Sequence, residues 1–348
     1  MNPSDSDTSA QGADVHITGA ALAGKRSSVR PAGIRLTRHA PGASGSRPAA
    51  WAQVPALLES ARPHQWAKNL LVFVPAILSG TILQPGPLSA VALSFIALSL
   101  IASGTYLLND LWDIEADRKH WSKCKRPLPS GRLSVGLALV AAPAGIALGL
   151  LLAAAIGPMV ALAAICYLTL TVCYSLAFKR VPILDVTVLA GLFTLRLVLG
   201  IASAGVFASP WLLVFSMFLF SSLCFAKRYV ELVRAAQRGT AGLAHRGYQD
   251  ADSPLLLVLG PSTGMGAVVT LVLYVIFDAF RQTFYGNTAW LWAFPLILFL
   301  WISRIWLMAA RGELDDDPVA FAVRDKPSIL LGAVMFGSFI LAWSGLFG

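Results

Sequence analysis

The sequence predicts an all-α protein that crosses a membrane many times, and three observations support this fold class. Hydrophobic residues make up 56% of the 348 residues and charged residues only 13%, whereas soluble domains carry about 25% charged residues. The apolar residues fall in long blocks, which is typical of membrane-spanning helices. Several blocks are joined by very short connections such as Ile156-Gly157-Pro158, and short connections indicate neighbouring antiparallel helices.

Nine blocks are predicted to span the membrane. In chain order they cover residues 67–84, 88–108, 132–155, 159–178, 183–203, 210–227, 254–279, 289–308 and 329–347. Each is close to the roughly 20 apolar residues that a helix needs to cross the hydrocarbon core. Residues 51–348 are therefore predicted to form one transmembrane domain.

Basic residues lie almost entirely on one side of these predicted helices. The loops after the second, fourth, sixth and eighth helices hold Arg118, Lys119, Lys123, Lys125, Arg126, Lys179, Arg180, Arg228, Arg234, Arg238, Arg246, Arg311, Arg324 and Lys326, and the opposite loops hold only Arg281. Short cytoplasmic loops are enriched in Lys and Arg. We therefore expect a multi-pass protein of the plasma (inner) membrane with a cytoplasmic N-terminus and an external C-terminus.

Residues 1–50 are rich in Ser, Gly, Ala, Pro and Arg and have no apolar period, so we expect a disordered cytoplasmic tail. The net charge of +9 fits basic loops that set topology and contact anionic lipid, and no nucleic-acid partner is expected. The four cysteines include no Cys-x-x-Cys pair, which favours burial over disulfides or a zinc site.

The most informative segment is an acidic run that follows the second predicted helix, Asn109-Asp110-Leu111-Trp112-Asp113-Ile114-Glu115-Ala116-Asp117. Asn109, Asp113 and Asp117 are four residues apart, so on a helix they line one face. Oxygen ligands stacked at the mouth of a membrane helix are costly unless a cation lies against them. Mg²⁺ carrying a diphosphate is the natural candidate, because Mg²⁺ prefers one or two carboxylates plus substrate phosphates.

A basic loop follows the acids directly and ends in Lys125-Arg126-Pro127-Leu128-Pro129-Ser130-Gly131. Acids followed by Lys and Arg suit a metal–diphosphate complex, since carboxylates bind the metal and the cations neutralise the remaining phosphate charge. The alternative is a basic loop that only sets topology, beside a solvated helix end.

Other polar residues share the same predicted side of the membrane. They are Lys68 and Asn69 at the entrance of the first helix, Tyr174 and Lys179 around the end of the fourth, and Lys227, Arg228, Tyr248, Asp250 and Asp252 from the end of the sixth onward. These side chains can contact phosphate, and Asp250 or Asp252 can supply carboxylate ligands to a second metal ion. Ordinary alternatives remain open, including an interfacial anchor for the first group and helix-dipole matching for the two acids.

Two charged residues lie inside predicted helices. Asp185 is at the start of the fifth helix, where an unpaired acid is costly. It is expected either to pair with Lys179 or Arg180 or to act as a ligand. Arg196 lies deeper in the same helix and is expected to snorkel or to bond to carbonyl groups.

The acidic run, the Lys125–Gly131 segment and the nine-helix layout resemble the UbiA superfamily of intramembrane prenyltransferases over residues 55–348. The resemblance implies an all-helical bundle in which the acids bind Mg²⁺ and a diphosphate, beside a groove that holds a lipid chain. Residues 62–69, the 174–179 stretch and Lys227-Arg228-Tyr229 resemble one branch, the decaprenyl-phosphate phosphoribosyltransferases.

This branch resemblance implies transfer of a phosphoribosyl group from soluble phosphoribosyl pyrophosphate to a polyprenyl phosphate, with release of pyrophosphate. The implied catalytic residues are Asp113, Asp117 and Lys179. The implied substrate-binding residues are Lys68, Asn69, Lys125, Arg126, Tyr174, Lys227, Arg228 and Tyr248. The implied metal ligands are Asn109, Asp113, Asp117, Asp250 and Asp252.

Two other functions remain open on the sequence. Prenyl transfer from a polyprenyl diphosphate to an aromatic acceptor such as 4-hydroxybenzoate would use the same first motif. Aromatic prenyltransferases of the superfamily usually carry a fuller second acidic motif, with acids four apart, than Asp250 and Asp252 provide. A polytopic transporter or lipid flippase would place ionisable residues near the bilayer midplane. Only Arg196 lies deep here, which favours chemistry at one face.

Overall fold

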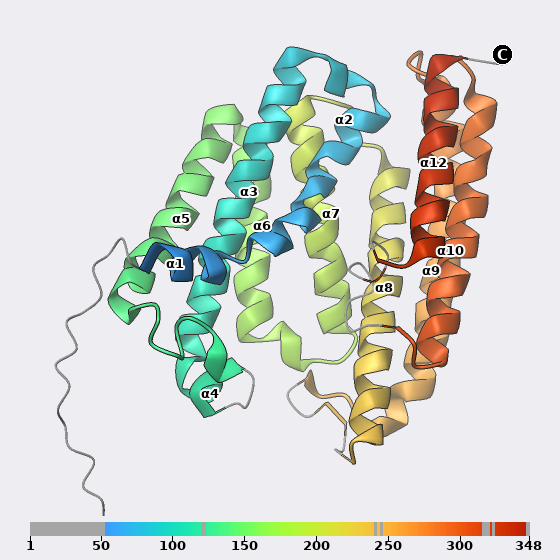
Figure 1. Cartoon of the computed structure of the whole chain (residues 1–348). Coiled ribbons are helices and arrows are strands. Elements are labelled where there is room, and N and C mark those ends of the chain that lie inside the picture. The colour runs from blue at the N-terminus through green and yellow to red at the C-terminus, as the bar shows by residue number, and fades with distance from the viewer. Residues whose placement is uncertain are drawn as a thin grey trace, which may run out of the picture. The chain divides into compact units, whose positions relative to one another are not determined.

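A computed structural model describes residues 53–119, 123–239, 242–243, 246–314, 321 and 324–345. Within these ranges all the regular secondary structure is helical apart from one isolated β-bridge between Leu243 and Tyr248, so the all-α prediction is confirmed there (Figure 1). The predicted tail of residues 1–50 lies outside the described residues.

Eight described helices are long and apolar enough to cross a membrane, as the multi-pass prediction requires. They are α3 (Pro85–Trp112), α5 (Val135–Ile156), α6 (Pro158–Leu176), α7 (Leu184–Ala204), α8 (Pro210–Gln237), α9 (Ser253–Phe277), α10 (Ala293–Ala310) and α12 (Lys326–Ser344). Among these eight, α3 and α7 are the most buried, whereas α5 and α12 are the least. The bundle is therefore organised around α3 and α7.

The first predicted helix, residues 67–84, is not a single helix. After the short helix α1 (Val54–Ala61), the chain forms the 3₁₀ helix η2 (Pro63–Phe73), the short helix α2 (Val74–Leu78) and the 3₁₀ helix η3 (Thr81–Leu83). Pro75 has no N–H for a continuous helix, and Gly80 has a left-handed φ of 73°. The described residues thus give eight continuous spans plus this broken segment. The count of nine is not confirmed, and the orientation of the termini stays a prediction.

The broken segment packs against both central helices, α3 and α7. Gly200 of α7 makes this approach possible, because a Cβ built there would lie 2.1 Å from the carbonyl oxygen of Val72 in η2. Backbone therefore meets backbone at this contact, and no side-chain rotation can relieve the clash that a residue larger than glycine would cause.

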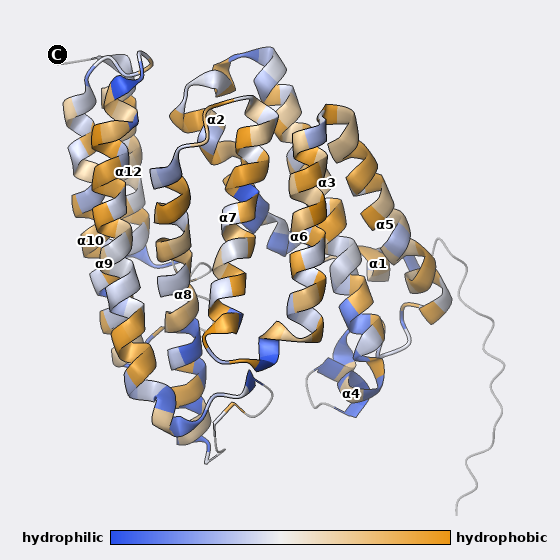
Figure 2. Ribbon diagram, turned by 180° about the vertical axis from the view of Figure 1, so that it is seen from behind, coloured by the Kyte–Doolittle hydropathy of each residue, from blue (hydrophilic) through white to orange (hydrophobic). Residues whose placement is uncertain are grey.

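The outer helices present apolar side chains away from the bundle. Val140 and Leu151 of α5 are each 67% exposed, and Phe336 of α12 is 65% exposed. Figure 2 shows apolar residues along the whole length of the helices, with hydrophilic residues gathered around α4 (Ile114–Lys119) and the neighbouring helix ends. This distribution is what a bilayer requires of a bundle that keeps its polar chemistry at one end.

Polar caps fix the ends of several helices. The hydroxyl of Ser134 accepts from the Leu137 N–H at the start of α5, and Asp325 accepts from the Ser328 N–H at the start of α12. Asp325 also pairs with Arg304 of α10 at 2.9 Å. The hydrogen bond from Arg304, together with those from Ser328, lowers the pKa of Asp325 to about 2. This carboxylate therefore joins α12 to α10.

We expect Gly200→Ala to destabilise the protein by about 1–3 kcal/mol, the usual cost of inserting a methyl group into a tight contact. The added Cβ would force η2 away from α7. The matched control is Gly191→Ala on the same helix, where the new Cβ would meet only the Leu170 side chain at 3.7 Å. Thermal unfolding of the two variants in detergent checks this, and an equal Tm for both would contradict the backbone contact.

Candidate functional site

The acidic run spans the junction of two helices. α3 ends at Trp112 and α4 begins at Ile114, with Asp113 between them at φ −94° and ψ 8°. Helical hydrogen bonds nevertheless continue through the junction, from Asp113 N–H to the Asn109 carbonyl (3.0 Å) and from Asp117 N–H to the Asp113 carbonyl (2.8 Å). Asn109, Asp113 and Asp117 therefore lie on successive turns, as their spacing predicts, but not on one uninterrupted helix.

Two of the acids are buried against arginines. Asp110 and Asp117 are 4% and 2% exposed. One nitrogen of Arg126 lies 2.7 Å from Asp117 and 3.2 Å from Asp110, and Arg62 lies 2.6 Å from the same oxygen of Asp110. Lys123 adds a longer contact of 3.5 Å to Asp117. The predicted loop residue Arg126 is thus brought directly onto the acids.

Sequence reasoning did not assign a role to Asp110 or Arg62. The signal was available in the spacing of Asp110 and Asp117, since residues seven apart share one face of a helix. Their partner Arg62 could not be found in this way, because it lies 48 residues from Asp110 in the sequence.

Asp113 differs from its neighbours because its side chain is exposed and no described side chain bonds to it. Among the residues that the structure describes, no three His, Cys, Asp or Glu side chains converge on one point. A metal at this place would therefore draw on few protein ligands. The oxygen donors of Asn109 and Asp113 fit Mg²⁺, which binds through one or two carboxylates and completes its shell with phosphates and water.

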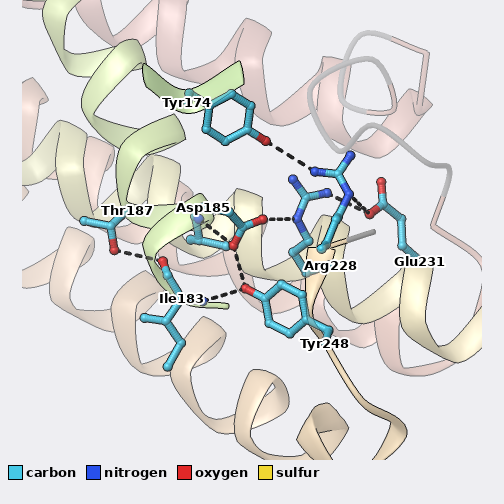
Figure 3. A network of polar contacts seen from close by, with 9 residues as sticks. Tyr174, Ile183, Asp185, Thr187, Arg228, Glu231 and Tyr248 are labelled. Atoms are coloured by element: carbon cyan, nitrogen blue, oxygen red, sulfur yellow. Dashed lines mark hydrogen bonds and ion pairs between the residues drawn. The ribbon is translucent and has the colours of Figure 1, made fainter. Parts of the chain in front are cut away.

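A second polar cluster lies at the start of α7 and the end of α8 (Figure 3). Asp185 and Arg228 are 0% and 1% exposed, and their side chains form an ion pair at 2.6 Å. Arg228 also contacts Glu231 at 2.7 Å. The expected pairing of Asp185 with Lys179 or Arg180 is wrong, because the partner comes from the next helix, 43 residues away.

Tyr248 closes this cluster from the loop before α9. Its hydroxyl donates to Asp185 (2.6 Å) and accepts from the Ile183 N–H (2.9 Å), where Ile183 has a left-handed φ of 66°. Burial and the hydrogen bond to Asp185 raise the pKa of Tyr248, so the phenol keeps its proton as the donor. Tyr248 therefore holds the turn into α7 and the carboxylate of Asp185 together.

Arg246 extends the cluster toward α6. Its guanidinium donates to the hydroxyl of Tyr174 at 3.3 Å and lies 3.7 Å from Glu231. Figure 3 shows Tyr174 and Glu231 on the same side of the cluster as Arg228, and Arg246 connects the two through these contacts. The predicted residues Tyr174, Arg228 and Tyr248 are thus brought together, and sequence reasoning missed Glu231 and Arg246.

A third group lies inside the bundle around Arg196, which is 6% exposed. Its guanidinium donates to the carbonyl of Leu192 (2.6 Å), to Asn69 (3.0 Å) and to the hydroxyl of Tyr167 (3.1 Å). The expected bond to a carbonyl is confirmed, whereas snorkelling is not seen. Asn69 in turn donates to Ser99 at 3.0 Å, so this predicted substrate-binding residue fixes the arginine.

Next to this group is a cavity of about 210 Å³ between η2, α7 and α8, lined by Lys68, Phe193 and Phe220 among others. The guanidinium carbon of Arg196 lies 5.1 Å from the centroid of the Phe193 ring and 5.0 Å from that of the Tyr167 ring. Lys68 thus lines the cavity, and Arg196 lies behind the Phe193 ring that forms part of its wall.

The remaining predicted residues lie at the same end of the bundle as α4 (Figure 1). Lys125 is exposed, and Lys179 is half-buried in the 3₁₀ turn η5 (Phe178–Arg180). Asp250 accepts from the Gly242 N–H (3.1 Å), and Asp252 accepts from the Gln249 N–H (2.8 Å). Both acids therefore stabilise the turn before α9, and their role as metal ligands stays a prediction.

We expect Tyr248→Phe to destabilise the protein by about 1–3 kcal/mol, because it leaves a partly buried N–H and a buried carboxylate each short of one hydrogen bond. The matched control is Tyr229→Phe on α8, whose hydroxyl has no hydrogen-bond partner among the described residues. Scanning fluorescence in detergent measures both Tm values. An unchanged Tm for Tyr248→Phe would show that the cluster does not hold the fold.

Comparison with known proteins places these features in context. A model of the UbiA prenyltransferase family matches residues 72–344. The chain is 41% identical over 285 residues to the uncharacterized protein y4nM of Sinorhizobium fredii, which covers 82% of this chain and 55% of that protein. It therefore spans about half the length of that relative.

Two further relatives align over most of their length. The nodulation protein NoeC of Azorhizobium caulinodans is 35% identical over 282 residues, covering 78% of this chain and 88% of NoeC. The decaprenyl-phosphate phosphoribosyltransferase of Mycobacterium tuberculosis is 28% identical over 299 residues, covering 85% and 94% of the two chains.

Solved structures share the fold. A UbiA homolog from Archaeoglobus fulgidus bound to GPP and Mg²⁺ matches with a TM-score of 0.61 and 18% identity, over 82% of this chain and 99% of that one. A structure described for digeranylgeranylglyceryl phosphate synthase matches with a TM-score of 0.60 and 16% identity, over 84% and 99%.

Proposed function

The chain belongs to the UbiA prenyltransferase family and is a membrane transferase, and on this premise we propose that it transfers a phosphoribosyl group to a polyprenyl phosphate. The donor is phosphoribosyl pyrophosphate, and the reaction takes place at the cytoplasmic face of the plasma membrane. The observation that carries the proposal is the near full-length similarity to decaprenyl-phosphate phosphoribosyltransferase.

Asn109 and Asp113 are the residues that would hold Mg²⁺, with Asp117 completing the set of oxygen donors. When bound, the ion neutralises the diphosphate leaving group as negative charge develops on it. Asp250 and Asp252 are the proposed ligands of a second ion at the same end of the bundle.

Arg126 and Lys123 are proposed to contact the donor diphosphate. Their side chains are 34% and 44% exposed, so both can turn toward a ligand while remaining near Asp117. Arg-to-phosphate contacts are strong and geometrically specific, which makes Arg126 the main candidate to orient the leaving group. Lys125, Lys179 and Lys227 add positive charge at the same face.

The acceptor phosphate is proposed to approach from the cavity lined by Lys68. An oxygen of the lipid phosphate forms the new bond to the anomeric carbon of ribose, and the bond from that carbon to pyrophosphate breaks. The acceptor is already anionic, so it needs no general base. The chain's contribution is to position the two substrates and to neutralise phosphate charge, with Arg196 as a fixed cation held by Asn69.

We expect the purified protein with Mg²⁺ to form a lipid-linked ribose phosphate from labelled phosphoribosyl pyrophosphate and a polyprenyl phosphate. The matched reaction contains a labelled polyprenyl diphosphate and 4-hydroxybenzoate, and it should give no product. Thin-layer separation of the labelled lipids distinguishes the two. A prenylated aromatic product would replace the proposal with aromatic prenyl transfer.

We expect Asp113→Asn to lower kcat/KM by about a hundredfold or more, the scale seen when a group that stabilises transition-state charge is lost. Its Tm should stay unchanged, because the side chain is exposed and has no described partner. Glu115→Gln is the control, since Glu115 is an exposed acid two residues along the same run. Undiminished turnover by Asp113→Asn would remove Asp113 from the site.

A further inference from the structure

A cavity of about 570 Å³ lies at the end of the bundle opposite the acidic run. It is formed by the end of α2, the connection between α7 and α8, and the end of α9 with the 3₁₀ turn η8 (Ala279–Arg281). In Figure 1 these elements lie at the opposite end of the helices from α4. The cavity is thus separate from the proposed transfer site.

One part of this cavity is apolar. Leu78, Val206, Phe277 and Phe284 contribute to its lining. Phe284 packs on Gly80 so closely that a Cβ at Gly80 would lie 2.0 Å from the ring. The Phe284 ring therefore packs directly on the backbone of Gly80, and the apolar wall offers a surface of the kind that lipid chains contact.

The other part carries one anion and one cation. Asp278 accepts a hydrogen bond from the hydroxyl of Ser209, and this hydroxyl also accepts from the Leu212 N–H at 3.0 Å. Arg281 is exposed at the rim, and among the described residues no carboxylate pairs with it. Asp278 and Arg281 line the same cavity without neutralising each other.

We propose that this cavity binds a zwitterionic phospholipid whose headgroup carries a primary ammonium, as in phosphatidylethanolamine. The phosphate contacts Arg281, the ammonium donates to Asp278, and the acyl chains follow the apolar wall. An anionic headgroup would satisfy Arg281 but leave Asp278 facing negative charge. A trimethylammonium headgroup cannot donate the hydrogen bond that Asp278 accepts.

The test measures lipid binding by the full chain after delipidation in detergent, using native mass spectrometry and Tm. Phosphatidylethanolamine should be retained and should raise Tm more than phosphatidylcholine or phosphatidylglycerol with the same acyl chains. Asp278→Asn and Arg281→Gln should each weaken this binding by about tenfold, the effect of losing one charge-assisted hydrogen bond. Arg311→Gln, which removes an exposed cation at the end of α10, should bind like the unchanged protein.

Three outcomes would overturn the proposal. Equal retention of the three lipids would remove headgroup selectivity. A preference for phosphatidylglycerol that depends on Arg281 and not on Asp278 would identify an anionic lipid. An equal Tm increase from soluble O-phosphoethanolamine would show that the site takes a free headgroup compound rather than a lipid. Transfer activity is not the readout, so the result is independent of the proposed reaction.

Discussion

The ion pair between Asp185 and Arg228 is the contact on which the polar end of the bundle depends. It joins the start of α7 to the end of α8 with both side chains almost completely buried. Removing one partner of such a pair leaves an uncompensated charge and costs several kcal/mol. Tyr248 attaches the loop before α9 to the same carboxylate. One acid thus links α7, α8 and the loop before α9.

The same electrostatic constraint shapes the acidic run. Buried carboxylates need partners, and Arg62 and Arg126 supply them for Asp110 and Asp117. Asp113 can remain without a partner because its side chain is exposed. Asp110 and Asp117 therefore hold the α3–α4 junction together through their arginine partners. Asp113 is exposed, and Asp117 must exchange part of its contact with Arg126 if it is to join Asp113 in binding a metal. The basic loop next to the acidic run therefore holds the buried acids in place and also offers positive charge for binding phosphate.

The sequence was sufficient to predict the long helices and the acidic run, because apolar length and residue spacing are local signals. It was insufficient for contacts between distant segments. Asp185 was expected to pair with Lys179 or Arg180 nearby, yet its partner is Arg228. The segment 67–84 is apolar enough to suggest a helix, but hydropathy does not register that Pro75 and Gly80 interrupt it. Long-range partners and backbone breaks are decided by packing, which the linear pattern does not contain.

The broken segment also constrains how the protein is made. A 3₁₀ helix has poorer hydrogen-bond geometry than an α-helix, and irregular backbone is tolerated at membrane depth only when protein encloses it. η2 ends at Phe73, whereas α7, which encloses it through Gly200, begins at Leu184. During synthesis the ribosome must therefore deliver α3, α5 and α6 before this partner exists. α3 follows the broken segment directly and also packs against η2, but η2 can be enclosed on its α7 side only after residues 184–204 have been synthesised.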